Sequence, residues 1–126
     1  MGRVQVKRIY EPAVRSDGFR VLVDRLWPRG VTKERAALDL WMKEIAPSTQ
    51  LRRWFAHEPK RWMQFRARYR AELLEHGSEL ALLRSRARKG TVTLLFGTRD
   101  VDHNEAVVLK EILTGKDANP LRARNE

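Results

Sequence analysis

Two runs of consecutive apolar residues constrain the fold of this chain more than any other feature. One run lies at residues 21–23 (VLV) and the other at residues 94–96 (LLF). A strand that is apolar on both faces belongs in the middle of a sheet covered on both sides, as in parallel α/β folds. The runs predict strands at residues 19–24 and 91–96, and an alternating segment predicts a third strand at residues 4–10.

Amphipathic segments between these strands predict helices. The first is expected at residues 32–45, because Leu38, Trp41, Met42 and Ile45 recur at spacings of three and four after a cap at Thr32. Four further helices are predicted: a short one that starts after Ser48 or Thr49, one from Pro59 to a cap at Gly77, one from Ser78 to Gly90, and one from a cap at Asp100 or Asp102 to Gly115.

The alternation of strands and helices favours the α/β class. We expect residues 1–115 to form a single compact layered domain, with a small, mostly parallel sheet flanked by helices. An all-helical bundle is the alternative because most residues lie in predicted helices, but three apolar strands disfavour it. Residues 116–126 have little apolar content and are expected to form a flexible C-terminal tail.

Composition narrows the classes of function. The chain has no cysteine, which excludes disulfides, thiolate metal sites and cysteine nucleophiles. No apolar run approaches the length of about 20 residues that a membrane span needs, and the N-terminus lacks a signal-peptide pattern, so we expect a cytosolic protein without membrane association. The net charge of +10 favours an anionic partner. Neither a cofactor nor an oligomeric state is indicated. The nucleotide-binding motifs GxGxxG and GxxxxGK[ST] are absent, and no metal site is predicted because the chain has no HExxH or comparable pair.

Polar clusters follow both of the strands that look central. Asp24, Arg25, Trp27 and Arg29 follow the first, and residues 98–104 (TRDVDHN) follow the second. In open α/β sheets, ligands bind beyond the carboxyl ends of the strands. If the two strands are parallel neighbours, the clusters meet at one edge of the sheet and form a pocket that binds an anion and has groups for acid–base catalysis.

Roles within this predicted site follow from side-chain chemistry. We expect His103 to be the acid or base, with Asp24 or Asp100 orienting it. Because His103 is predicted on the first helical turn, where the helix dipole disfavours imidazolium, a neutral imidazole is expected. Further ligand contacts, to phosphate or carboxylate above all, are predicted for a second group of residues, which comprises Arg25, Trp27, Arg29, Arg99, Asn104 and His57.

Each of these residues also has a structural interpretation. Asp24 and Arg25 are equally suited to an ion pair at the end of a strand. Trp27 is more suited to packing beneath its loop than to stacking on a ligand. Asp100 or Asp102 is as suited to capping a helix as to catalysis.

A basic and aromatic segment at residues 52–70 offers a second hypothesis. It carries seven basic residues, opposed only by Glu58, and five aromatic ones. Such a mixture binds single-stranded nucleic acid when the aromatic rings are exposed. At helical spacing, however, the aromatic residues fall on one stripe and the arginines on another, which favours a core helix with a solvated face. A non-enzymatic interaction protein with excess surface charge is the third hypothesis.

Four ordered stretches also resemble a known family. VDRLWPRGVTKE, LDLWMKEIAPS, RWFAHEPKRWMQFRARY and LLFGTRDVDHNEAVVLKE are similar to the family 488 of domains of unknown function, in its short bacterial YeaO-like branch. The resemblance runs from about residue 6 to residue 113. It implies a compact α/β protein and implies no particular reaction. The matching motif positions are Asp24, Arg25, Trp27, Pro28, Arg29, Gly30, Trp54, Phe55, His57, Arg99, Asp100, His103 and Asn104.

Overall fold

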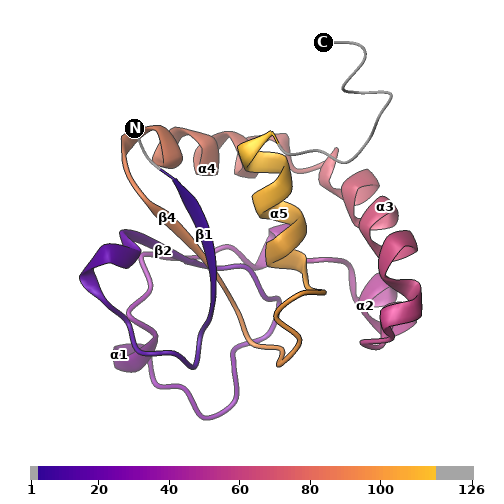
Figure 1. Cartoon of the computed structure of the whole chain (residues 1–126), viewed down its shortest axis with the longest axis horizontal. Helices are drawn as coiled ribbons and strands as arrows, with labels where there is room; N and C mark the ends of the chain where they lie inside the picture. Colours follow the sequence, from indigo (N-terminus) through magenta and orange to yellow (C-terminus); the bar gives the residue numbers. More distant parts are fainter. Residues whose placement is uncertain (1–2, 116–126) are drawn as a thin grey trace.

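A parallel sheet organises the protein. The computed structural model describes residues 3–115, in which four strands form one sheet: β1 (Val4–Arg8), β2 (Phe19–Leu22), β3 (Leu40–Trp41) and β4 (Val92–Phe96). Their order is β1-β4-β2-β3 and every pairing is parallel. Figure 1 labels β1, β2 and β4 of this sheet. The predicted α/β class with a small parallel sheet is therefore confirmed. The predicted flexible tail, residues 116–126, lies outside the described residues.

The two apolar strands are direct neighbours. β2 pairs with β4 from Phe19↔Val92 to Leu22↔Leu95, and the pairing continues where the Val23 N–H donates to the Leu95 carbonyl at 3.0 Å. The chain segments that follow β2 and β4 consequently leave the sheet side by side, as the sequence predicted.

Apolar packing on both faces of the sheet explains the consecutive apolar residues. Val21 and Leu94 belong to a large core cluster, whereas their neighbours Leu22 and Leu95 belong to a second cluster on the other face. All five residues of β4 are buried, because that strand lies between two others and is covered on both sides. Side chains that alternate between two apolar layers remove the need for polar residues in the strand.

Helices supply the remaining walls of the core. The α-helices are α1 (Lys33–Ala36), α2 (Thr49–Phe55), α3 (Trp62–Leu73), α4 (Gly77–Lys89) and α5 (Glu105–Thr114), and three short 3₁₀ helices are η1 (Arg15–Asp17), η2 (Lys43–Ile45) and η3 (Pro59–Arg61). Residues of α2, α3, α4 and α5 contribute to the large cluster, whereas Ala36 of α1 packs in the second one. Within residues 3–115, none of the helices combines the length and apolarity that a bilayer span requires.

The predicted helix at residues 32–45 is wrong beyond its first turn. Thr32 is the cap, since its hydroxyl accepts from the Arg35 N–H at 3.1 Å, but Ala37 adopts a left-handed conformation (φ 47°) that ends α1. Leu40–Trp41 then pairs with β2 as strand β3. The backbone of β2 would otherwise lie unpaired at the sheet edge, and pairing satisfies it better than a second helical turn would.

Three of the predicted helix ends are confirmed by the structure, and one is wrong. Ser48 caps α2 by accepting from the Leu51 N–H at 3.1 Å, Gly90 ends α4, and Gly115 ends α5 in a left-handed conformation (φ 75°). Gly77 was expected to end the preceding helix and instead begins α4. The break between α3 and α4 falls at residues 74–76, where no glycine or proline marks it.

Candidate functional site

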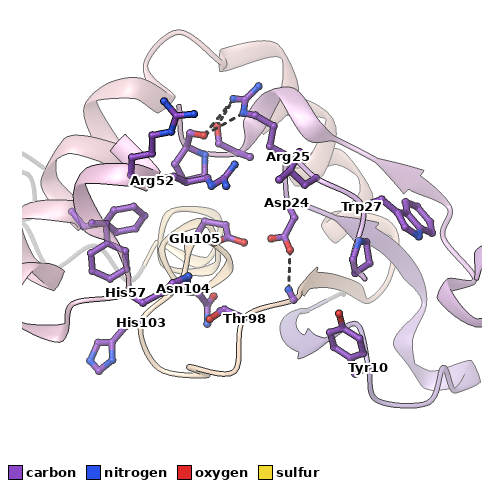
Figure 2. A pocket seen from close by; sticks show the side chains of 18 residues that line it. Tyr10, Asp24, Arg25, Trp27, Arg52, His57, Thr98, His103, Asn104 and Glu105 are labelled. Atoms are coloured by element: carbon purple, nitrogen blue, oxygen red, sulfur yellow. Dashed lines mark hydrogen bonds between the residues drawn. The ribbon is translucent and has the colours of Figure 1, made fainter. Parts of the chain in front are cut away.

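A pocket of about 470 Å³ lies beyond the carboxyl ends of β2 and β4. Its walls come from the loop after β2, the loop after β4, the first turn of α5, and α2 with the residues that follow it (Figure 2). The pocket brings together six of the predicted site residues, which are Asp24, Arg25, Trp27, His57, His103 and Asn104. Arg29, Arg99 and Asp100 do not line it.

Two carboxyl groups face each other within the pocket. Asp24 Oδ2 accepts from the Gly97 N–H at 2.9 Å, so this side chain ties the loop after β2 to the loop after β4. Glu105, the first residue of α5, points toward Asp24 (Figure 2). Burial, followed by the negative charge of Asp24 and a hydrogen bond with it, raises the pKa of Glu105 well above its ordinary range, although Arg52 acts in the opposite direction. The pair therefore tends to hold one proton between two carboxyl groups.

Arginine side chains form another side of the pocket. Arg25 donates from Nη2 to the Ala46 carbonyl at 3.1 Å, and from Nε and Nη2 to the Pro47 carbonyl at 3.4 Å each. These bonds hold the guanidinium group in place. Its third nitrogen, Nη1, makes no hydrogen bond within residues 3–115. Arg52 extends from α2 to the same side of the pocket as Arg25 (Figure 2). The guanidinium groups of Arg52 and of its neighbour Arg53 make no hydrogen bond or ion pair within the described part of the chain.

His103 is oriented by Asp100 rather than by Asp24. Its Nδ1 lies 3.0 Å and 3.1 Å from the two carboxylate oxygens of Asp100, and since a carboxylate only accepts, Nδ1 carries a proton. Burial acts against ionised Asp100, but hydrogen bonds from the His103 side chain and from the Asp102 and His103 backbone lower the pKa of Asp100 below its ordinary value. The imidazole packs edge-on against Trp62, with ring centroids 5.1 Å apart, and points away from Asp24 and Glu105 (Figure 2).

The start of α5 differs from the sequence prediction. Asn104 is the cap: its Oδ1 accepts from the Val107 N–H at 3.1 Å, and its Nδ2 donates to the Asp100 carbonyl at 2.9 Å. Asp100 instead accepts from the Asp102 and His103 N–H groups within the loop. His103 thus precedes the helix, and the expectation that it lies on the first helical turn is wrong. The helix-dipole argument made for its imidazole therefore has no basis.

Substitution of Asn104 by alanine is expected to lower the free energy of unfolding by about 0.5–2 kcal/mol, the usual range for the loss of a helix cap. The side chain is 3% exposed and makes both bonds that hold the loop to α5, so the loss should fall at the upper end of that range. Urea unfolding followed by tryptophan fluorescence measures it. Asp102→Ala is the matched control, because Asp102 is exposed and does not cap the helix; equal losses in both variants would contradict the assignment of the cap.

The other predicted site residues have varied surroundings. Trp27 donates from Nε1 to the Val31 carbonyl at 2.7 Å and packs edge-on against Trp41, so it mainly supports its loop. His57 is exposed at the pocket rim in a left-handed conformation (φ 57°). Arg29 and Arg99 are exposed side chains outside the pocket.

Two residues of the pocket, Glu105 and Arg52, were not predicted as site residues. Glu105 lies within the last predicted helix and was assigned no role, because the cap was expected at residue 100 or 102. Recognition of Asn104 as the cap would have placed Glu105 at the first helical position, beside the loop that carries the site. Arg52 was assigned to the basic face of residues 52–70, because no local sequence pattern indicates that α2 forms a wall of the pocket.

Much of that basic and aromatic segment serves the fold. Arg66 Nη2 and Arg70 Nη2 lie 2.7 Å and 3.0 Å from the Glu111 carboxylate on α5. Arg61 and Arg68 lie against the Trp54 ring. The neighbouring aromatic rings stack on one another inside the core, and these are Phe55, Trp62, Phe65 and Tyr69. The aromatic stripe therefore packs inward, as the core interpretation requires.

Within residues 3–115, no three histidine, aspartate or glutamate side chains come together as ligands for a metal ion. The polar groups of the pocket are instead two carboxyl groups, three guanidinium groups and two imidazoles at its rim. This set suits a ligand that carries negative charge and hydrogen-bonding groups.

Known proteins resemble this chain along most of its length. The uncharacterised protein YeaO of Escherichia coli (strain K12) is 48% identical over 110 residues, which are 87% of this chain and 96% of that protein. The uncharacterised protein Rv3073c of Mycobacterium tuberculosis (strain ATCC 25618 / H37Rv) is 42% identical over 114 residues, which are 90% of this chain and 96% of that protein. No solved structure matches the chain. Residues 3–123 match the family DUF488-N3i, described as the "Inactive DUF488-N3 subclade", and the chain therefore belongs to the DUF488 family.

Proposed function

We propose that this protein binds a small phosphorylated or carboxylated molecule in the pocket beyond β2 and β4. The observation that carries the proposal is the pair of guanidinium groups, Arg25 and Arg52, on one side of the pocket (Figure 2). Arg25 is held by the Ala46 and Pro47 carbonyls, so an anion would meet a positive group that is already oriented. A cytosolic location remains part of this proposal.

Binding without catalysis is the form of the proposal that the observations favour. The matching subclade is described as inactive. His103, the predicted acid or base, is paired with Asp100 and points away from the two carboxyl groups of the pocket (Figure 2). Catalysis through His103 is the second candidate, favoured by the Asp100–His103 hydrogen bond, which resembles the way a general base is oriented. It requires that a ligand reach the rim of the pocket as well as its interior.

Arg52→Gln is expected to weaken the binding of inorganic phosphate about tenfold, the effect of one lost charge-assisted hydrogen bond. Arg52 is exposed on a short helix and makes no ion pair in the described structure, so the fold should not change. Isothermal titration calorimetry, or shifts of backbone amide resonances, measures the dissociation constant.

The control for this experiment is Arg99→Gln. It makes the same change of charge on an exposed arginine outside the pocket and should alter the dissociation constant less than twofold. A wild-type protein that does not bind phosphate at millimolar concentrations, or an Arg99 variant as impaired as the Arg52 variant, would overturn the proposal.

Nucleic acid is the alternative anionic partner, and the net charge of +10 is what favours it. The engagement of Arg66 and Arg70 with Glu111, and the inward packing of the aromatic stripe, remove much of the surface that stacking on bases would need. Retention on immobilised single-stranded DNA at low salt, with an affinity that falls steeply as salt rises, would favour this alternative.

A further inference from the structure

The carboxyl groups of Asp24 and Glu105 occupy a pocket that also contains the guanidiniums of Arg25 and Arg52. Figure 2 shows the two carboxyl groups turned toward each other, on the side away from the guanidinium group of Arg25. Asp24 bonds to the Gly97 N–H and the two carboxyl groups bond to each other, but a ligand that satisfies only the arginines would leave their remaining lone pairs without a donor, which is costly in a partly buried site. The pocket therefore selects a ligand with two chemically different ends.

We infer that the Asp24–Glu105 pair recognises the hydroxyl groups of a sugar, so that the ligand of this pocket is a sugar phosphate, either free or as part of a nucleotide. The inference deepens the proposed function and rests on it: the arginines bind the phosphate, and the carboxyl pair binds the sugar. The carboxyl pair would thus be a recognition element separate from the arginines that bind the anion.

The chemistry of a proton-sharing carboxyl pair matches a hydroxyl group better than it matches an ammonium group. A hydroxyl both donates and accepts, and a pair with one proton also offers both a donor and acceptors. An ammonium group only donates, so it would favour two ionised carboxylates, which burial and mutual repulsion oppose at this position. Carboxylates that accept from ribose hydroxyls recur in dinucleotide-binding sites, which are also located at the carboxyl ends of parallel strands.

The size and the apolar walls of the pocket agree with such a ligand. Its volume of about 470 Å³ lies within the range of about 300–1,000 Å³ that is usual for small-molecule sites. Apolar and aromatic side chains line it between the polar groups, and these include Tyr10, Leu26, Pro28, Pro47 and Phe55. They suit the carbon-bound face of a sugar ring, or a base attached to it.

The test compares two phosphate monoesters that differ in their hydroxyl groups. Ribose 5-phosphate and n-pentyl phosphate are titrated into the full chain by calorimetry. The wild-type protein is expected to bind ribose 5-phosphate at least about tenfold more tightly, because two or more hydroxyl hydrogen bonds are gained. Glu105→Met keeps the length of the side chain but cannot hydrogen-bond in the same way, so the ratio of the two dissociation constants should fall to about one.

Two further variants separate recognition from folding. Glu105→Gln retains a donor and an acceptor and should keep most of the preference for ribose 5-phosphate, whereas Glu34→Met, an exposed glutamate on α1 outside the pocket, should keep all of it. Equal affinity of the wild-type protein for both esters would overturn this inference and leave the anion site intact. Failure of both esters and of inorganic phosphate to bind the folded protein would overturn the proposed function, and this inference with it.

Discussion

Asp17→Asn is expected to lower the free energy of unfolding by about 3–5 kcal/mol, because it removes the carboxylate that pairs with the side chains of Lys7 and Arg20 in a buried cluster of charges. Asp17 is 1% exposed and accepts from Arg20 Nη1 at 2.5 Å, from Lys7 Nζ at 3.0 Å and from the Val14 N–H at 3.1 Å. Arg20 is itself 4% exposed. An asparagine would leave the guanidinium group of Arg20 buried without a counter-charge.

The same cluster should make the protein sensitive to acid. Burial opposes ionised Asp17, but hydrogen bonds from the Val14 backbone, Lys7 and Arg20 prevail and lower the pKa of Asp17 below its ordinary value of 3.8. A depressed folded-state pKa gives stability that is present above the unfolded-state pKa and is lost as pH falls through the folded one. The contribution is thus complete at neutral pH and disappears only in strong acid, below about pH 4.

Urea unfolding at pH 7, followed by tryptophan fluorescence, measures the effect. Asp102→Asn makes the same chemical change at an exposed position and should alter stability by less than about 0.5 kcal/mol. A loss below about 1 kcal/mol in the Asp17 variant would show that the cluster is more hydrated than its burial indicates.

Glu105→Gln is expected to stabilise the protein at neutral and alkaline pH, although it changes a residue of the proposed binding site. The pKa of Glu105 is raised, first by burial and then by Asp24, so the folded protein binds this proton more tightly than the unfolded chain does. Wild-type stability therefore falls as pH rises from the ordinary glutamate pKa of 4.5 through the folded-state pKa. Glutamine does not titrate, so the variant should lack this fall.

The ionisable groups around Glu105 determine its pKa and therefore the pH range of the expected effect. Asp24 raises its pKa and Arg52 lowers it, while Tyr69, a buried neighbour on α3, has a pKa raised well above 10.0 and stays neutral in the range tested. Each unit of pKa displacement corresponds to about 1.4 kcal/mol. In a domain of this size, 1 kcal/mol shifts the melting temperature by about 4 °C.

Melting temperatures from pH 4.5 to pH 9 measure the difference between wild-type and Glu105→Gln proteins. The difference should be small at the acidic end and should grow as pH rises. Glu34→Gln, at an exposed position, should follow the wild-type curve at every pH. Parallel curves for the wild-type protein and the Glu105 variant would contradict the raised pKa. A stabilised variant would show that Glu105 is kept in the pocket at a cost to the fold, as is common for residues of binding sites.

Local sequence determined the two central strands and the edge of the sheet at which the polar residues after them lie. Val21 to Val23 and Leu94 to Phe96 are apolar at every position, and only a strand buried on both faces uses such a run. The sequence predicted a mostly parallel sheet, in which the polar residues after two neighbouring strands leave at the same edge, and the parallel pairing of β2 with β4 confirms it. The meeting of Asp24 with the loop that begins at Gly97 follows from this, and the hydrogen bond between them shows it.

Tertiary structure decided what local pattern left open. Residues 38–45 have helical periodicity, yet the free edge of β2 takes Leu40 and Trp41 as a strand, because a long-range pairing satisfies more backbone groups there than another helical turn. Asp100, Asp102 and Asn104 are all suitable caps by type, and only the path of the loop selects Asn104. That selection sets Glu105 opposite Asp24 and turns His103 toward Asp100. The pairing of two carboxyl groups depends on contacts between residues 81 positions apart, which no local pattern contains.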